Sequence, residues 1–115
     1  LFISFYTLQF IAPHHRHTLL RRIYDTLPLG GGLILFEKVR ANDARFQDMF
    51  TDLHTCFKLE NKYTSDQIHH KRQSLVGVLE PFTREENFRM MQAAGFDKIT
   101  SIFQYLCFDG YLCIK

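Results

Sequence analysis

Few side chains of this sequence combine the residue types and spacing that chemistry requires. Glu37 and Lys38 follow the apolar run 33–36 and therefore stand at the expected carboxyl end of a strand. Open α/β sheets place their ligands at such strand ends, so the pair is a candidate ligand contact, with an ordinary strand-end charge pair as the alternative. Arg72 follows Lys71 in a polar helix-forming stretch, and this position alone indicates a solvent-facing side chain.

For most of the other side chains that could do chemistry, the sequence favours a structural role. His54 lies one turn from Phe50 and Phe57, which indicates a partly buried structural histidine rather than a catalytic base. Cys56 has no acidic partner, so we expect a buried, inert thiol. Tyr63 follows a polar loop and could reach a ligand or pack against the fold. Neighbouring histidines at a helix start point in different directions, so solvated helix surfaces rather than metal or RNA contacts are expected for His14, His15, His17 (with Arg16 among them), His69 and His70.

The composition describes one ordinary globular domain. The chain has 115 residues, of which 46% are hydrophobic, and a formal net charge of +2, too weak to imply a nucleic-acid surface. No apolar run reaches the roughly 18 residues that cross a bilayer, and the start lacks a secretory signal. The three cysteines form no CxxC pair, which argues against a disulfide framework or a metal site. We expect a cytoplasmic protein without direct contact to nucleic acid or membrane.

Hydrophobic periodicity predicts a βαβ unit at the start of the chain. Residues 1–10 are apolar on both faces and predict a strand of a covered parallel sheet. A helix is predicted over 14–27, and the glycines at 30–32 turn the chain into a second strand over 33–39. The chain opens inside an apolar run, which leads us to expect that it is the tail of something longer.

Three helices and a hairpin are predicted to follow. Asn42 or Asp43 is the expected N-cap of a helix that reaches Phe57, and residues 59–64 are expected to form a loop. Ser65-Asp66 is expected to cap a polar helix that runs to about Leu79, and Thr83 with Glu86 forms a capping-box pattern for a helix that stops at Gly95. Strands are predicted over 99–105 and 111–114, joined by a turn at Asp109-Gly110, and the phenylalanines are assigned to the core.

The order of elements, a parallel βαβ unit followed by a terminal antiparallel pair, is specific. Residues 28–35, Pro-Leu-Gly-Gly-Gly-Leu-Ile-Leu, resemble the motif before the fifth strand of many S-adenosylmethionine-dependent methyltransferases. The resemblance implies one partial domain over 1–115: strands four to seven of a seven-stranded Rossmann-like sheet, the C-terminal half, with the N-terminal cofactor-binding half missing. The first strand would then be an unpaired edge.

The sequence is most similar to one family of this fold, the carboxy-S-adenosyl-L-methionine synthases. Four stretches carry the resemblance in order: Thr7-Leu8-Gln9-Phe10; Glu37-Lys38; His54, Phe57, Lys58, Asn61 and Tyr63 leading to Ile68 and Lys71-Arg72; and Phe103-Gln104 with Phe108, Leu112 and Lys115. The resemblance implies a homodimeric enzyme that makes carboxy-S-adenosylmethionine from S-adenosylmethionine and prephenate, for tRNA wobble-uridine modification. It also implies that Arg72 contacts a carboxylate, a task that suits the fork of a guanidinium.

Several departures qualify what the resemblance implies. Phe5 occupies the position of an asparagine that lines the cofactor site in this family, and the glycine-rich first loop is absent. The only glycine cluster, at 30–32, precedes a strand and cannot cradle a nucleotide in the usual way. Two alternatives therefore stay open: an ordinary S-adenosylmethionine-dependent methyltransferase, or a non-catalytic remnant or dimerisation module. We expect the 115 residues alone to be inactive and to bind S-adenosylmethionine poorly.

Overall fold

Four strands of mixed direction form the centre of the molecule, described over residues 1–115 by a computed structural model. The elements are β1 (Phe2–Phe5), a 3-10 turn (Leu8–Phe10), α1 (Pro13–Thr26), β2 (Gly32–Lys38), α2 (Ala44–Glu60), α3 (Ser65–Leu75), α4 (Arg84–Ala93), β3 (Lys98–Tyr105) and β4 (Phe108–Ile114). The strand order is β1-β2-β4-β3, with β1 parallel to β2 and the other pairs antiparallel. The predicted α/β class and closing hairpin are confirmed.

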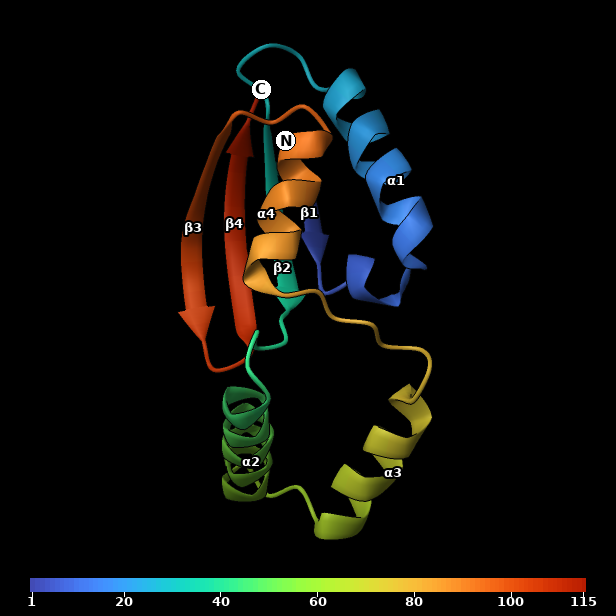
Figure 1. Ribbon diagram of the computed structural model, residues 1–115, viewed down its shortest axis with the longest axis vertical. Helices are drawn as coiled ribbons and strands as arrows, with labels where there is room; N and C mark the ends of the chain where they lie inside the picture. The colour runs from blue at the N-terminus through green and yellow to red at the C-terminus, as the bar shows by residue number, and fades with distance from the viewer.

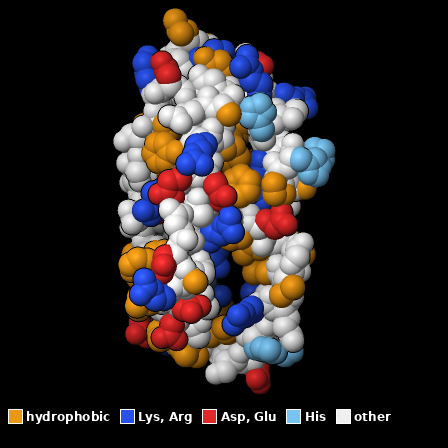
Figure 2. Space-filling model, viewed as in Figure 1, with side chains coloured by type: hydrophobic (Ala, Val, Ile, Leu, Met, Phe, Trp, Pro, Cys, Tyr) orange, Lys and Arg blue, Asp and Glu red, His pale blue; other side chains and the backbone are white.

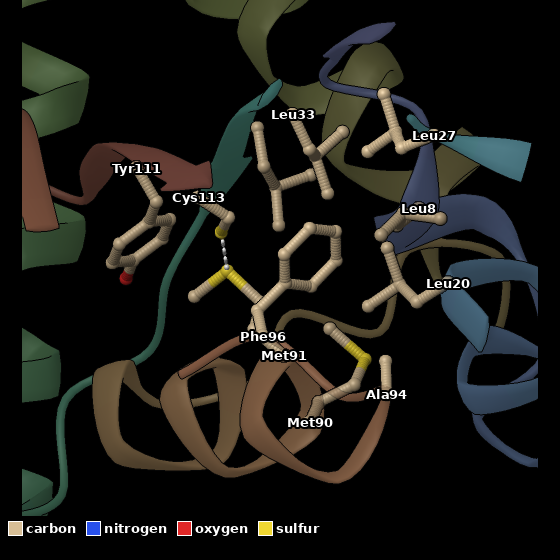
Figure 3. Packing of buried hydrophobic residues seen from close by; sticks show 11 residues of the cluster. Leu8, Leu20, Leu27, Leu33, Met90, Met91, Ala94, Phe96, Tyr111 and Cys113 are labelled. Atoms are coloured by element: carbon tan, nitrogen blue, oxygen red, sulfur yellow. Dashed lines mark hydrogen bonds between the residues drawn. The ribbon is translucent and has the colours of Figure 1, made fainter. Parts of the chain in front are cut away.

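Helices α1 and α4 lie side by side over one face of the sheet (Figure 1). Their apolar sides meet alternate residues of β2 and β4 and form the core (Figure 3), which consists of Leu8, Leu20, Leu27, Leu33, Leu35, Met90, Met91, Ala94, Phe96, Tyr111 and Cys113. The side chain of Lys115 fixes the end of β4 to this layer, because its Nζ donates to the carbonyls of Tyr24 and Leu27, both at 2.8 Å.

The opposite face of the sheet carries apolar side chains that no helix of the chain covers. In β2, Leu33 and Leu35 are buried under the helices, whereas Ile34 and Phe36 between them are only half-buried. Phe5, which pairs with Phe36 on the edge strand β1, is 63% exposed. Parallel strands are usually covered on both faces, so this surface and the free edge of β1 are unpartnered parts of the sheet.

Helices α2 and α3 extend past the carboxyl ends of β1 and β2 (Figure 1). Neither helix contains a fully buried residue. Their ends are nevertheless well formed, because the Asp43 side chain accepts from two backbone amides of α2 and Thr64 forms a capping box with Gln67. Thr64 therefore caps α3, not Ser65 or Asp66 as predicted, whereas the expected caps at Asp43 and Thr83 are confirmed.

The predicted end of the first strand and the predicted position of the hairpin turn are wrong. The first strand ends at Phe5 instead of residue 10, because Tyr6 has a φ of 52° and turns the chain into the 3-10 turn. The hairpin turn lies at Leu106-Cys107, where Leu106 takes the left-handed conformation with a φ of 50°. Asp109 and Gly110 are paired residues of β4 instead. Two boundaries also differ slightly from the prediction: α2 continues to Glu60 into the expected loop, and α3 ends at Leu75 instead of about Leu79.

Three expectations about burial are also wrong. Cys56 is exposed, because it lies on the outer side of α2. Arg16 belongs to the expected solvated helix entry but is only 2% exposed. Its guanidinium donates to the carbonyls of Ile11, Gln9 and Glu80 and so ties three chain segments together. The phenylalanines are mostly outside the core; those exposed are Phe2, Phe5, Phe10, Phe46, Phe57 and Phe103.

Replacing Gly110 with alanine should destabilise the fold. A Cβ atom there would lie 2.7 Å from the Phe36 ring and 3.0 Å from Cβ of Phe103, so the sheet would have to shift. We expect the free energy of unfolding to fall by about 1–3 kcal/mol, measured by urea denaturation. Gly32→Ala is the matched control, because its nearest neighbours would lie at 3.4–3.5 Å, an ordinary contact. Equal effects of the two substitutions would contradict the steric explanation.

Candidate functional site

A cleft of about 410 Å³ lies between α2, α3 and the carboxyl end of β2. Figure 2 shows it as a hollow in the lower part of the molecule, with blue Lys and Arg side chains along it. Its walls are formed by apolar side chains from α2, α3 and the segment after α3, among them Phe50, Leu59, Ile68, Leu75 and Leu79. The cleft thus occupies the position, beyond parallel strand ends, where α/β folds bind ligands.

The polar lining of the cleft is basic. Of its 16 lining residues none is acidic, and the cationic or imidazole side chains are Lys38, His54, Lys58, His69 and Arg72. They come from three elements, since Lys38 ends β2, His54 and Lys58 lie on α2, and His69 and Arg72 lie on α3. A concave surface with charges of one sign attracts ligands of the opposite sign, so this cleft suits an anion with an apolar body.

The half-buried basic groups of the cleft lower one another's pKa values. Burial lowers the pKa of the Lys58 ammonium, and the nearby charge of Lys38 lowers it further. The pKa of His54 is lowered to about 4 by burial and then by Lys58 and Lys38. His54 is therefore a neutral imidazole at neutral pH, packed edge-on against Phe108 with ring centroids 5.2 Å apart. This agrees with the predicted partly buried structural histidine, although its ring also borders the cleft.

Of the three predicted site residues, only Arg72 lines the cleft. Tyr63 is 55% exposed and lies outside it. Phe5 belongs to an aromatic row at the carboxyl end of β1. The ring centroids of Phe5 and Tyr6 lie 4.5 Å apart, and those of Tyr6 and Phe108 lie 5.5 Å apart. Since Phe108 also contacts His54, the row connects the end of β1 with the cleft. A ligand that covered both places would lie along these rings.

The predicted pair Glu37-Lys38 is divided between two environments. Lys38 borders the cleft, whereas Glu37 is 3% exposed and faces the helix-covered side of the sheet. Its Oε1 accepts from the amide of Leu8 at 3.0 Å, while the Gln9 side chain accepts from the amide of Lys38 at 2.7 Å. These bonds hold the 3-10 turn against the end of β2. Burial raises the pKa of Glu37 to about 7, even though Leu8 and Arg16 favour its charged form.

Stability should fall as the pH rises from about 4.5 to 7, because the unfolded Glu37 ionises at the lower value and the folded one at the higher. In that window the folded state binds more protons, and a shift of this size corresponds to about 3 kcal/mol. Glu37→Gln keeps an oxygen for the Leu8 amide and should flatten this slope in urea denaturation. Glu60→Gln, at the exposed end of α2, is the control. A Glu37→Gln variant that kept the full slope would contradict this assignment.

The glycine cluster at 30–32 has a structural role in the fold. Gly30 and Gly31 lie in the turn between α1 and β2, which begins at Gly32, and a Cβ on Gly31 would meet the Pro28 carbonyl at 2.8 Å, so Gly31 packs closely against the chain. At the end of β1, Phe5 offers an apolar ring without hydrogen-bonding groups.

Lys58 lines the cleft but was not among the candidate site residues chosen by residue type. It lies four residues after His54, so both side chains are on one face of α2, and this spacing could have identified Lys58 from the sequence.

The molecule contains no group of three or more His, Cys, Asp or Glu side chains that could hold a metal ion. None of the helices combines the length and apolar character that a membrane-crossing helix requires.

Curated proteins from several bacteria match nearly the whole chain. A carboxy-S-adenosyl-L-methionine synthase of Pseudomonas syringae pv. syringae is 44% identical over 109 residues, covering 95% of this chain and 44% of that protein. A protein of the same name from Campylobacter jejuni subsp. jejuni is 38% identical over 114 residues, covering 99% of this chain and 48% of that protein. The chain spans about half the length of the curated relatives it matches. No family model matches it.

Two solved structures show the same fold. Human N-acetylserotonin methyltransferase in complex with S-adenosylmethionine superposes with a TM-score of 0.64 at 22% identity, over 98% of this chain and 28% of that one. The methyltransferase SibL, in its apo form, gives a TM-score of 0.60 at 14% identity, over 98% of this chain and 30% of that one. The chain thus shares its fold with part of each of these two proteins.

Proposed function

We propose that this chain, which is homologous over nearly its whole length to part of the carboxy-S-adenosyl-L-methionine synthases, is the C-terminal portion of such an S-adenosylmethionine-dependent transferase. Its sheet would be four strands of seven, completed along β1 by the remaining strands. The free edge of β1, the uncovered apolar face of the sheet and the double length of the relatives support this arrangement.

The proposed reaction takes S-adenosylmethionine and prephenate as substrates and yields carboxy-S-adenosylmethionine for the modification of tRNA wobble uridines. The observation that carries this proposal is the position of Arg72 in a basic cleft without acidic residues, beside apolar walls that suit the ring of prephenate. Arg72 would hold a carboxylate through two charge-assisted hydrogen bonds. Phe5 and Tyr63 would be contacts at the rim of the cofactor site. A homodimer and a cytoplasmic location complete the proposal.

The test is a chimera in which this chain replaces the matching 109 residues of the P. syringae relative. Incubated with S-adenosylmethionine and prephenate, it should yield carboxy-S-adenosylmethionine and phenylpyruvate, detected by mass spectrometry. Formation of S-adenosylhomocysteine in the presence of a methyl acceptor, with no carboxylated product, would favour an ordinary methyltransferase. A folded chimera without either product would favour a non-catalytic remnant or dimerisation module, an alternative that the ring of Phe5 at the cofactor position supports.

A further inference from the structure

The cations of the cleft have no partners within the chain. The four ion pairs of the molecule join Arg21 with Asp25, Arg40 with Glu86, Arg45 with Asp43 and Arg84 with Asp109. None of them includes Lys38, Lys58 or Arg72, the lysine and arginine side chains that border the cleft. Glu37, the acidic neighbour of Lys38 in sequence, faces the other side of the sheet.

Such an arrangement is unfavourable for the chain alone. Lys38 and Lys58 are half-buried, and each raises the free energy of the other by charge repulsion in a partly dehydrated site. Half-buried charges normally have counter-ions, either from the protein or from a ligand. The fold supplies no counter-ion, although Gln47, Thr51, Thr55 and Ser65 around them give the cleft further hydrogen-bonding groups.

We propose that Lys38 and Lys58 form a second anion-binding point in the cleft, separate from Arg72, which allows it to hold a dicarboxylate with an apolar body. Arg72 lies on α3, whereas Lys38 and Lys58 lie at the end of β2 and on α2, so the two points are on different walls. The apolar body would contact the side chains of Phe50, Ile68 and Leu75, which line the same cleft. Only the role of Arg72 in this inference rests on the proposed function. The second anion-binding point is inferred from the residues that line the cleft.

Binding of an anion at this point has a consequence for His54. Lys58 on α2 and Lys38 on β2 are the charges that act on its ring. The other titratable groups that line the same cleft are Cys107 before β4, and Arg72 and His69 on α3. A carboxylate between the two lysines would offset their repulsion of a positive imidazolium. The ring of His54 should therefore titrate at a higher pH when the cleft is occupied, which makes it a reporter that is independent of catalysis.

The experiment is calorimetric titration of the 115-residue chain with phenylsuccinate, which has two carboxylates on an apolar body, and with phenylacetate, which has one. Phenylsuccinate should bind more tightly, and Lys38→Gln or Lys58→Gln should weaken its binding about tenfold while changing phenylacetate binding less. Lys58→Arg keeps the charge and should retain most of the affinity. Lys98→Gln, at the exposed start of β3 and outside the cleft, is the control for net charge and should change the affinity less than twofold.

The proposal is overturned if phenylsuccinate does not bind, or if both lysine variants bind it within twofold of the original chain while circular dichroism shows them folded. The imidazole titration of His54, followed by NMR and assigned with His54→Asn, gives a second readout. A midpoint that rises with phenylsuccinate supports the proposal, and an unchanged midpoint at saturation contradicts it. Lysine-dependent binding together with a chimera that makes no carboxy-S-adenosylmethionine would refute the proposed function and leave the second anion-binding point in place.

Discussion

Replacing Arg72 with alanine in the chimera should lower kcat/KM for prephenate by about 100-fold. Arg72 is the guanidinium of the cleft, and a guanidinium paired with a carboxylate through two charge-assisted hydrogen bonds contributes roughly 3 kcal/mol. Each 1.4 kcal/mol corresponds to a factor of ten, which gives the expected size. Product formation measured by mass spectrometry over a range of prephenate concentrations checks it.

The chain offers two matched variants for this experiment. Arg72→Lys keeps the charge but loses the planar fork, so it should recover only part of the lost activity. Arg45→Ala removes an arginine whose side chain is 87% exposed on α2 outside the cleft, and it should leave kcat/KM unchanged. If Arg72→Ala retained full activity, the carboxylate contact would have to be assigned to another cation. An equal loss of kcat/KM on Arg45→Ala would point to a general effect of the positive charge on α2 and α3.

The order of elements was predictable from the sequence because its signals are local. Leu19, Leu20, Ile23 and Leu27 follow the period of a helix, and the glycines at 30–32 separate that helix from a continuous apolar strand. Asp43 and Thr83 have the side chains that cap helices. Each of these depends on residues within a few positions, and the structure contains the corresponding helices and strand.

The errors arose where distant residues decide the local structure. Asp109-Gly110 has the composition of a tight turn, but the carboxylate of Asp109 is held by Arg84 and Gly110 leaves room for the ring of Phe36, so both remain in β4. Arg16 was expected in solvent because its neighbours are histidines, but its guanidinium donates to the carbonyl of Glu80, 64 positions away, as well as to those of Gln9 and Ile11. The basic cleft likewise combines residues from three elements far apart in the sequence, whose meeting no periodicity could indicate.

Breaking the ion pair between Arg84 and Asp109 should have the largest effect on stability. Asp109 is fully buried, and its carboxylate accepts from Nε of Arg84 at 2.6 Å, from Nη2 at 3.0 Å and from the Tyr111 hydroxyl at 2.9 Å. Arg84→Ala leaves this carboxylate in the core with only the tyrosine as a donor. We expect a loss of about 3 kcal/mol in the free energy of unfolding, measured by urea denaturation.

Asp109→Ala should destabilise the protein less than Arg84→Ala. The side chain of Arg84 is 38% exposed and can turn toward water when its partner is removed, whereas the buried carboxylate of Asp109 cannot. The hydroxyl of Tyr111 would still lose its acceptor, at a cost of about 1–2 kcal/mol. The order of the two single variants thus distinguishes an uncompensated buried charge from the loss of a favourable contact, which would affect both variants equally.

A double-mutant cycle completes this test. The variant with both alanines contains neither the buried charge nor its cation, so its loss should be well below the sum of the single losses. Asp25→Ala is the control, since its pair with Arg21 joins side chains that are 55% and 52% exposed, and its removal should change stability far less. Additive single losses would show that the two side chains act independently. A coupled result would establish that α4 is held on the sheet by one buried charge and its partner, in addition to the apolar contacts of Met91 and Phe88.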